Sequence, residues 1–166
     1  MKRFFAIILV VAALVSCKPL EEQITVNDCN LESLDNVSIA QSQLKLGTSL
    51  TIDAENESCQ NISVTKLYAE LFNKNEKRVA TIELAGEKGD PKPTLHSRSN
   101  EKVSVPLLIG FDSPLSVITL STMSLDDYAE KGYTVTYDCT LTAGIVSKRF
   151  RDEKVPVARL VKMLER

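Results

Sequence analysis

Two stretches in the second half of the chain alternate between apolar and polar side chains. They cover residues 102–111 and 133–141. Because a period of two places every second side chain on one face of an extended strand, both stretches are predicted to be β-strands with one buried face. The same alternation recurs, in shorter form, over residues 36–40, 44–52, 62–71, 80–84 and 145–150. About seven short strands at regular spacing predict a mostly β domain, an antiparallel sandwich, with a small α+β sheet as the alternative.

Two irregularities interrupt this pattern. The apolar positions change phase between Val64 and Leu67, which predicts a β-bulge because one additional residue exchanges the two faces of a strand. Pro106 has no amide hydrogen for a sheet ladder, so we expect its strand at a sheet edge or at an irregularity. Residues 53–61 and 86–93 are rich in turn-forming and charged residues, and both are predicted to be loops.

Short helices are predicted in the last third of the chain. Pro114 after an aspartate and a serine indicates a helix start, and Ser124 with Asp127 resembles a capping box. Gly132 stands where such a helix would end. After Pro156, apolar residues recur at helical spacing and predict an amphipathic helix that packs on the sheet, or alternatively lies on a membrane or a partner.

The first 17 residues describe an export signal. Two basic residues precede an apolar run over residues 4–15, and Ser16 stands before Cys17. The run of 12 residues makes a helix about 18 Å long, which is short of the roughly 30 Å hydrocarbon core of a bilayer. The segment Leu14-Val15-Ser16-Cys17 resembles a bacterial lipobox, which implies cleavage before the cysteine and its acylation. An ordinary cleaved signal and a retained anchor are the alternatives.

This interpretation divides the chain into three parts. Residues 1–16 are the signal peptide, residues 17–33 are the lipidated cysteine and a polar tether, and residues 34–166 are one β-sandwich domain. Several acyl chains would hold the protein firmly in a membrane. We therefore expect a lipid-anchored protein of a bacterial cell envelope, at the outer membrane on its periplasmic side or at the cell surface.

The charge balance argues against nucleic acid as a partner. The chain has 20 basic and 22 acidic residues, and removal of Lys2 and Arg3 with the signal leaves a net charge of −4. Nucleic-acid binding is favoured by clustered lysine and arginine. Tryptophan is absent and aromatic residues make up 5% of the chain, so no stacking platform for bases is evident.

Three cysteines follow Cys17. Cys29 and Cys59 both fall near predicted strand ends, and they are the candidate disulfide because an exported protein can form one. Cys139 lies on the apolar face of its strand and is predicted to be a buried thiol. With three thiols, at least one stays unpaired in a monomer, and the spacing alone does not fix the pairing.

Four segments together resemble a late embryogenesis abundant type 2 (water stress and hypersensitive response) domain. The segments, in order, are Leu50-Thr51-Ile52-Asp53-Ala54-Glu55-Asn56, Ile62-x-Val64-x-x-Leu67-x-Ala69-x-Leu71, Val103-Ser104-Val105-Pro106-Leu107 and Tyr133-Thr134-Val135-Thr136. The resemblance covers roughly residues 35–155. It implies an immunoglobulin-like or fibronectin-III-like β-sandwich with one to three short helices, and it implies no catalytic residue.

No pattern in the sequence indicates catalysis or a bound cofactor. His96 is the only histidine, and no Gly-x-Ser-x-Gly nucleophile motif is present. Asp53, Glu55 and Glu57 alternate as calcium ligands do, but the glycine at the sixth place and the glutamate at the twelfth place of a calcium loop are missing. We therefore expect no metal, no cofactor and no enzyme activity.

These observations predict a non-catalytic binding or structural module. Its predicted contact loops supply the candidate binding residues, which are Asp53, Glu55, Asn56, Glu57, Asp90 and Lys92. The expected partners are the membrane, through the lipid anchor, and an envelope protein, lipid or glycan. Two alternatives are a lipid-handling envelope module and an envelope hydrolase that uses carboxylates far apart in the sequence.

Overall fold

A computed structural model describes residues 24–31, 35–40 and 43–164 of the chain. Residues 1–23, which include the predicted signal peptide, Cys17 and the first part of the predicted tether, lie outside the described residues. The described strands are β1 (Ile24–Leu31), β2 (Asp35–Ala40), β3 (Gln43–Asn56), β4 (Ile62–Phe72), β5 (Arg78–Leu84), β6 (Thr94–Leu95), β7 (Ser99–Phe111), β8 (Thr134–Ala143) and β9 (Val146–Pro156). The described helices are α3 (Pro114–Thr122), α4 (Leu125–Glu130) and α5 (Val157–Leu164).

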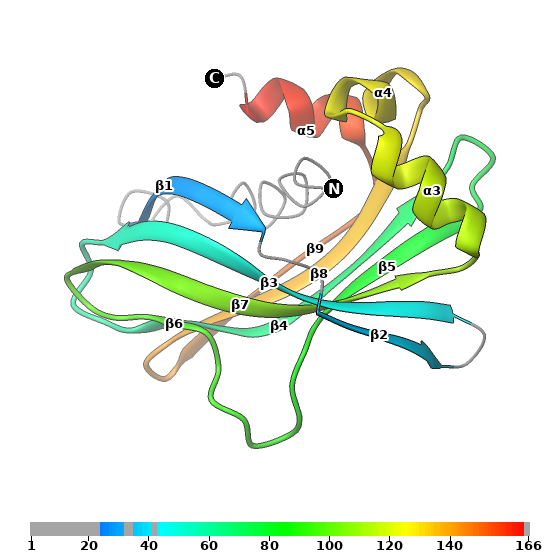
Figure 1. The fold of residues 1–166 in the computed structure, drawn as a ribbon. Helices are drawn as coiled ribbons and strands as arrows, with labels where there is room; N and C mark the ends of the chain where they lie inside the picture. Colours follow the sequence, from blue (N-terminus) through cyan, green and yellow to red (C-terminus); the bar gives the residue numbers. More distant parts are fainter. Residues whose placement is uncertain (1–23, 32–34, 41–42, 165–166) are drawn as a thin grey trace.

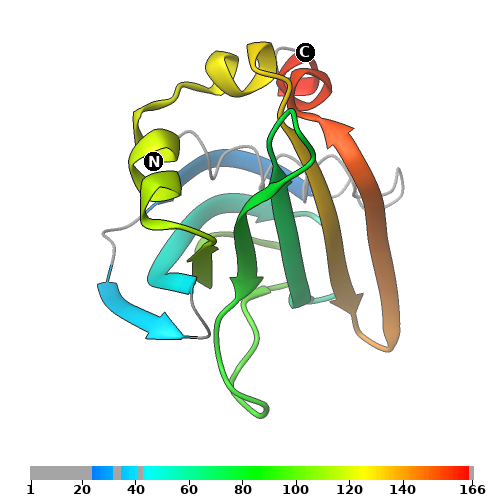
Figure 2. The same cartoon turned by 90° about the vertical axis from the view of Figure 1, so that its right-hand side faces the viewer.

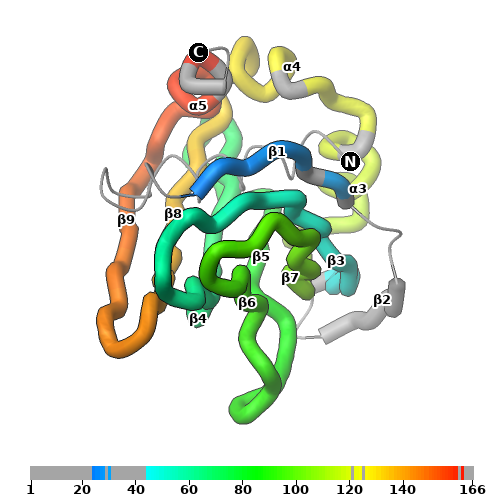
Figure 3. Tube along the Cα trace, turned by 90° about the vertical axis from the view of Figure 1, so that its left-hand side faces the viewer, coloured from blue at the N-terminus to red at the C-terminus, as the bar shows by residue number. Residues whose placement is uncertain are grey.

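All nine described strands belong to one antiparallel sheet (Figure 1). Its main order is β1-β3-β7-β5-β4-β8-β9, while β2 pairs with β3 and β6 pairs with β4. Viewed from one end in Figure 3, the sheet curls so that its two halves enclose a common interior. The prediction of a mostly antiparallel, sandwich-like β fold with one to three short helices is confirmed, and both layers come from one continuous sheet.

The core fills the concave face of this curled sheet. Leu107 and Ile109 are fully buried on β7, and Ile82 lies buried on the neighbouring strand β5. The helices lie over one end of the sheet (Figure 2), where Tyr128 of α4 and Val157 of α5 are also fully buried. Packing of the C-terminal amphipathic helix against the sheet, one of its two interpretations, is therefore confirmed.

Local sequence signals explain the helix ends. The Ser113 side chain accepts a hydrogen bond from the backbone N–H of Ser116, and proline occupies the first turn of α3. The Ser124 side chain accepts from the backbone N–H of Asp127, whose carboxylate accepts from the backbone N–H of Ser124 in return. Gly132 follows α4 with a φ of 70°, as a residue after a helix end often does. Both predicted helix starts are confirmed.

The predicted bulge is also confirmed. The register between β4 and β8 shifts between Val64 and Lys66, at the place where the apolar pattern changes phase. This shift returns Leu67 to the buried face.

The N-terminal half of the sheet departs from the sequence prediction at two places. Residues 24–31, which were predicted to belong to the tether, form strand β1 and pair with β3. Residues 53–56, which were predicted to begin a loop, extend β3 and pair with β1 on one side and β7 on the other. Aspartate, glutamate and asparagine have low strand propensity, but pairing with two neighbours overrides that preference here.

The structure gives no support to the candidate disulfide between Cys29 and Cys59. Cys29 lies opposite Ile52 in the pairing of β1 with β3, whereas Cys59 lies beyond the end of β3 as a free, exposed cysteine. Four strand positions separate Ile52 from the end of β3 at Asn56, or about 13 Å at about 3.3 Å per residue. Cys139 is a free thiol that is 1% exposed, which confirms its prediction as a core cysteine.

Candidate functional site

The sheet divides into a fork between β4 and β5. The two strands pair from Phe72 and Arg78 at one end to Tyr68 and Glu83 at the other, and there the pairing stops. Further along β4, only Ile62 and its neighbour in sequence pair with the short strand β6. Residues 64–67 of β4 therefore have a strand partner, β8, on one side only.

Two residues explain why β5 leaves β4 here. The last pair between β5 and β7 is Leu84 with Leu107, and the Ala85 N–H then donates to the Pro106 carbonyl at 2.8 Å. Because the N–H and C=O of one residue in an antiparallel strand point to the same side, the missing N–H of Pro106 faces the end of β5. Gly86 follows with a φ of 122°, which turns the chain out of the sheet.

Pro106 was predicted to lie at a sheet edge or at an irregularity. Its strand β7 is in fact internal, between β3 and β5, so the edge alternative is wrong. The irregularity is present, since Pro106 lies next to the fork.

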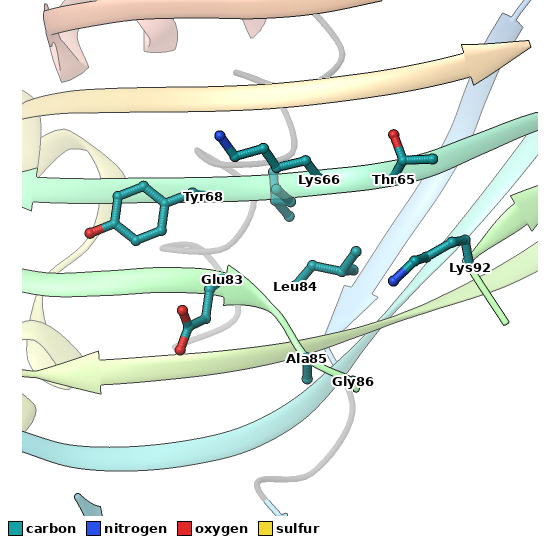
Figure 4. Close-up of a pocket in the computed structure, with 9 residues that line it drawn as sticks. Thr65, Lys66, Tyr68, Glu83, Leu84, Ala85, Gly86 and Lys92 are labelled. Atoms are coloured by element: carbon teal, nitrogen blue, oxygen red, sulfur yellow. The ribbon is translucent and has the colours of Figure 1, made fainter. Parts of the chain in front are cut away.

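A pocket of about 280 Å³ lies in this fork (Figure 4). Its walls come from β4, from the end of β5 and from the loop that follows β5. The residues that line it are Thr65, Lys66, Leu67, Tyr68, Glu83, Leu84, Ala85, Gly86 and Lys92. The pocket is thus bordered by the one-sided stretch of β4 and by both polar and apolar side chains.

Ion pairs with other strands of the sheet already occupy two of the three charged side chains that line the pocket. Lys66 donates to Asp138 of β8 at 2.5 Å, and Glu83 accepts from Lys45 of β3 at 3.2 Å. Lys92 forms no ion pair with any side chain in the described part of the chain. Its amine points into the fork from the far side of Leu84 (Figure 4). Lys92 is therefore the cation that the pocket offers to a ligand.

Tyr68 closes one end of the pocket. Its hydroxyl donates to the Glu70 carboxylate at 3.0 Å, and Glu70 also accepts from Arg78 at 3.0 Å. Burial, followed by the hydrogen bond to Glu70, raises the pKa of the Tyr68 phenol above its usual value. The phenol thus stays protonated at neutral pH and holds a fixed orientation.

Asn56, a predicted binding residue, is a structural residue instead. Its side chain is fully buried. Its amide donates to the Gln60 and His96 carbonyls at 2.9 and 3.0 Å, and its carbonyl accepts from the Ser58 N–H at 3.0 Å. These bonds hold the turn after β3 against the turn after β6. Asn56 is therefore not available to a ligand.

The other predicted binding residues separate into different places. Asp53 and Glu55 lie on β3, partly buried, and Glu57 is exposed in the turn that follows. The Asp90 carboxylate accepts from the Glu87 N–H at 2.7 Å and so holds its own loop. Of the six predicted residues only Lys92 lines the pocket in the fork.

The remaining lining residues were not predicted as a site. Two signals in the sequence pointed to the fork without identifying it: the phase change between Val64 and Leu67, and the proline at position 106. Each of these signals on its own indicates only a local irregularity. Both irregularities lie beside the same gap because of the order of the strands in the sheet. Local side-chain periodicity gives no information about that order.

No group of three or more His, Cys, Asp or Glu side chains within residues 24–31, 35–40 and 43–164 is arranged to hold a metal ion. No helix in that same part of the chain combines the length and the apolar character needed to cross a bilayer.

Comparisons with known proteins give similarity at the level of the fold. No family model and no curated protein matches the chain. A protein from Archaeoglobus fulgidus aligns with 15% identity over 77% of this chain and 91% of its own, at a TM-score of 0.44. An uncharacterised β-sandwich protein from Clostridium difficile aligns with 12% identity over 78% and 84%, at a TM-score of 0.33.

A late embryogenesis abundant protein is among the structural neighbours. It aligns with 12% identity over 90% of this chain and 80% of its own, at a TM-score of 0.25. The resemblance noted from the sequence thus has a weak structural counterpart and no match to a family model. At these TM-scores the neighbours carry no argument about function.

Proposed function

We propose that this chain is a lipid-anchored, non-catalytic binding module of a bacterial cell envelope, which binds an extended acidic segment of a partner protein in the fork. The anchor is the acylated Cys17, and its support is the lipobox-like segment that ends the export signal. The same proposal includes similarity to late embryogenesis abundant type 2 domains. That resemblance implies no catalytic residue.

The observation that carries the binding proposal is the one-sided stretch of β4. Val64, Lys66 and Leu67 pair with β8, and no described strand pairs with residues 64–67 on the pocket side. The Val64 N–H already donates to the Pro93 carbonyl at 2.9 Å, so the chain after the loop occupies one end of the gap. An extended segment that adds to a free strand edge gains main-chain hydrogen bonds, and neighbouring pockets then select its side chains.

Lys92 supports an acidic ligand. Its ammonium has no carboxylate partner among the described residues and points into the fork. Leu84 and Leu67 supply apolar contacts beside it. A segment with one carboxylate next to an aliphatic side chain fits this arrangement.

The two alternative functions have less support in the geometry. A hydrolase of the kind considered from the sequence needs two carboxylates in one cleft, and the pocket contains one, Glu83, which pairs with Lys45. A lipid-handling module needs an apolar groove, and the lining of this pocket is mixed. A volume of about 280 Å³ also lies just below the range of about 300–1,000 Å³ that is usual for small-molecule sites.

The test is selection of phage-displayed hexapeptides on the full chain. Sequences that contain Asp or Glu should be enriched, and their affinity should fall roughly tenfold in Lys92→Glu, because an exposed ion pair is replaced by a repulsive one. Lys74→Glu, a matched reversal in the exposed turn between β4 and β5, should leave the affinity unchanged. Equal affinity of wild type and Lys92→Glu, or no enrichment at all, would contradict the proposal.

A further inference from the structure

The hairpin between β8 and β9 ends in two exposed aliphatic side chains. Gly144 and Ile145 form the turn, and Ile145 is fully exposed while Val146 is 62% exposed. Gly144 has a φ of 59°, which a tight two-residue hairpin turn requires. Apolar side chains at such a tip add nothing to the core, and their transfer from water to an apolar surface is favourable.

This hairpin lies at the end of the sandwich where the described chain begins. Ile24, the first residue of β1, pairs with Asn56, whose side-chain amide donates to the Gln60 carbonyl at 2.9 Å. The Gln60 side chain in turn lies 3.6 Å from the position of a Cβ built on Gly144. Figure 3 views this end of the sandwich, with the β8–β9 hairpin at its edge.

The same end is within reach of the proposed lipid anchor. Seven residue positions separate Cys17 from Ile24. At about 3.4 Å per residue, this stretch spans at most about 24 Å when fully extended. A membrane that holds the acyl chains of Cys17 therefore lies close to the end of the domain that carries the hairpin.

Basic side chains follow the aliphatic tip on β9. Arg149 and Arg151 are more than half exposed and form ion pairs with Asp138 and Glu153. Lys148 is partly exposed and pairs with no carboxylate in the described residues. Its ammonium lies 5.8 Å from the centre of the Phe150 ring. Aliphatic side chains followed by basic ones match the order of acyl chains and anionic headgroups at a membrane surface.

We propose that the tip formed by Ile145 and Val146 inserts into the interface of the bilayer that carries the lipid anchor. The inference rests on the proposed anchor and adds a second contact, which fixes the hairpin end of the domain toward the membrane. The occupant is a lipid surface, because the anchor brings that surface to this end and because Lys148, two residues after the tip, is a cation with no carboxylate partner among the described residues.

Helix α3 offers a matched control at the other end of the sandwich. Its Ile118 is 63% exposed and, like Ile145, is an isoleucine with most of its side chain in solvent. Strand β7 runs over 13 residues from Ser99, opposite Asn56, to Phe111, shortly before α3. Its length is about 40 Å at about 3.3 Å per residue, so α3 lies far from the proposed membrane contact (Figure 1).

The test uses tryptophan fluorescence, because the chain contains no tryptophan of its own. Full-length Ile145→Trp and Ile118→Trp variants are processed in a bacterial host and placed in vesicles of phosphatidylethanolamine and phosphatidylglycerol at 3:1. The inference predicts that emission of the Ile145→Trp protein moves to shorter wavelength and is quenched by brominated lipids. Emission of the Ile118→Trp protein should match that of an exposed indole in water.

Three outcomes would overturn the inference, and they are distinguishable. If both proteins sediment with the vesicles but the Ile145→Trp emission stays that of water, the anchor stands and the hairpin contact is wrong. If neither protein carries lipid or sediments with vesicles, the anchor itself fails and the inference falls with it. A shift of the Ile145→Trp emission only on addition of another protein would identify the tip as a protein contact instead.

Discussion

Replacement of Asn56 by alanine should destabilise the domain by about 2–4 kcal/mol. The side chain is fully buried and joins two turns, through donors to the Gln60 and His96 carbonyls and an acceptor for the Ser58 N–H. Alanine removes these three hydrogen bonds, while the Gln60 and His96 carbonyls keep the Ser58 and Ser99 hydroxyls as donors. Each hydrogen bond lost costs about 0.5–1.5 kcal/mol, which gives the expected total.

The assay is urea unfolding followed by circular dichroism. With a slope of about 2 kcal/mol per molar urea, the expected loss lowers the unfolding midpoint by about 1–2 M. Asn56→Asp should cost at least as much, because it retains the acceptor, removes both donors and places a charge in the interior. The matched control is Asn100→Ala, an exposed asparagine on β7, which should shift stability by less than about 0.5 kcal/mol.

A midpoint for Asn56→Ala within error of the Asn100→Ala midpoint would refute this reasoning. It would mean that the turns after β3 and β6 are held by other contacts.

Three further predictions concern stability and thiol reactivity. Tyr128→Phe removes the buried hydroxyl that donates to a carbonyl of α3 at 2.7 Å, and should cost about 1 kcal/mol in the same urea assay; no change would show that this bond is unimportant. Hydrogen bonds from Arg149 and then Lys66 hold the pKa of the Asp138 carboxyl well below its usual range. The stability that this carboxylate contributes is present above its ordinary pKa of about 4 and is lost as pH falls through the lowered value. The loss in free energy of unfolding caused by Asp138→Asn should therefore become smaller below about pH 4. A loss that is independent of pH would contradict this. Burial raises the pKa of the Cys139 thiol to about 11, so iodoacetamide at pH 8 should label Cys59 and leave Cys139 unlabelled until the chain is unfolded, as read by peptide mass spectrometry. Equal labelling of both thiols in the folded chain would be inconsistent with the buried position.

Local signals predicted the elements that depend on neighbouring residues. The alternation around Ile109 identified β7, and the capping pattern at Ser124 identified the start of α4. The phase change after Val64 identified the bulge in β4. Each of these features follows from side-chain periodicity or from hydrogen bonds within one turn, so the sequence contains enough information to locate it.

Features that depend on distant strands were not predictable in the same way. The extension of β3 through Asp53 and Glu55 needs partners on both sides, β1 and β7, which overcome low strand propensity. The burial of Asn56 depends on a turn 40 residues later in the chain. The fork required Pro106 and the end of β5 to adjoin the same gap, and only the strand order of the sheet brings them there.

The central claim of the proposed function is that this domain is held at a membrane through Cys17. Intact mass spectrometry of the protein extracted from bacterial membranes tests that claim most directly. The account predicts a chain that begins at Cys17 and carries the added mass of several acyl chains. A chain that retains residues 1–16, begins at another residue or carries no lipid would contradict it.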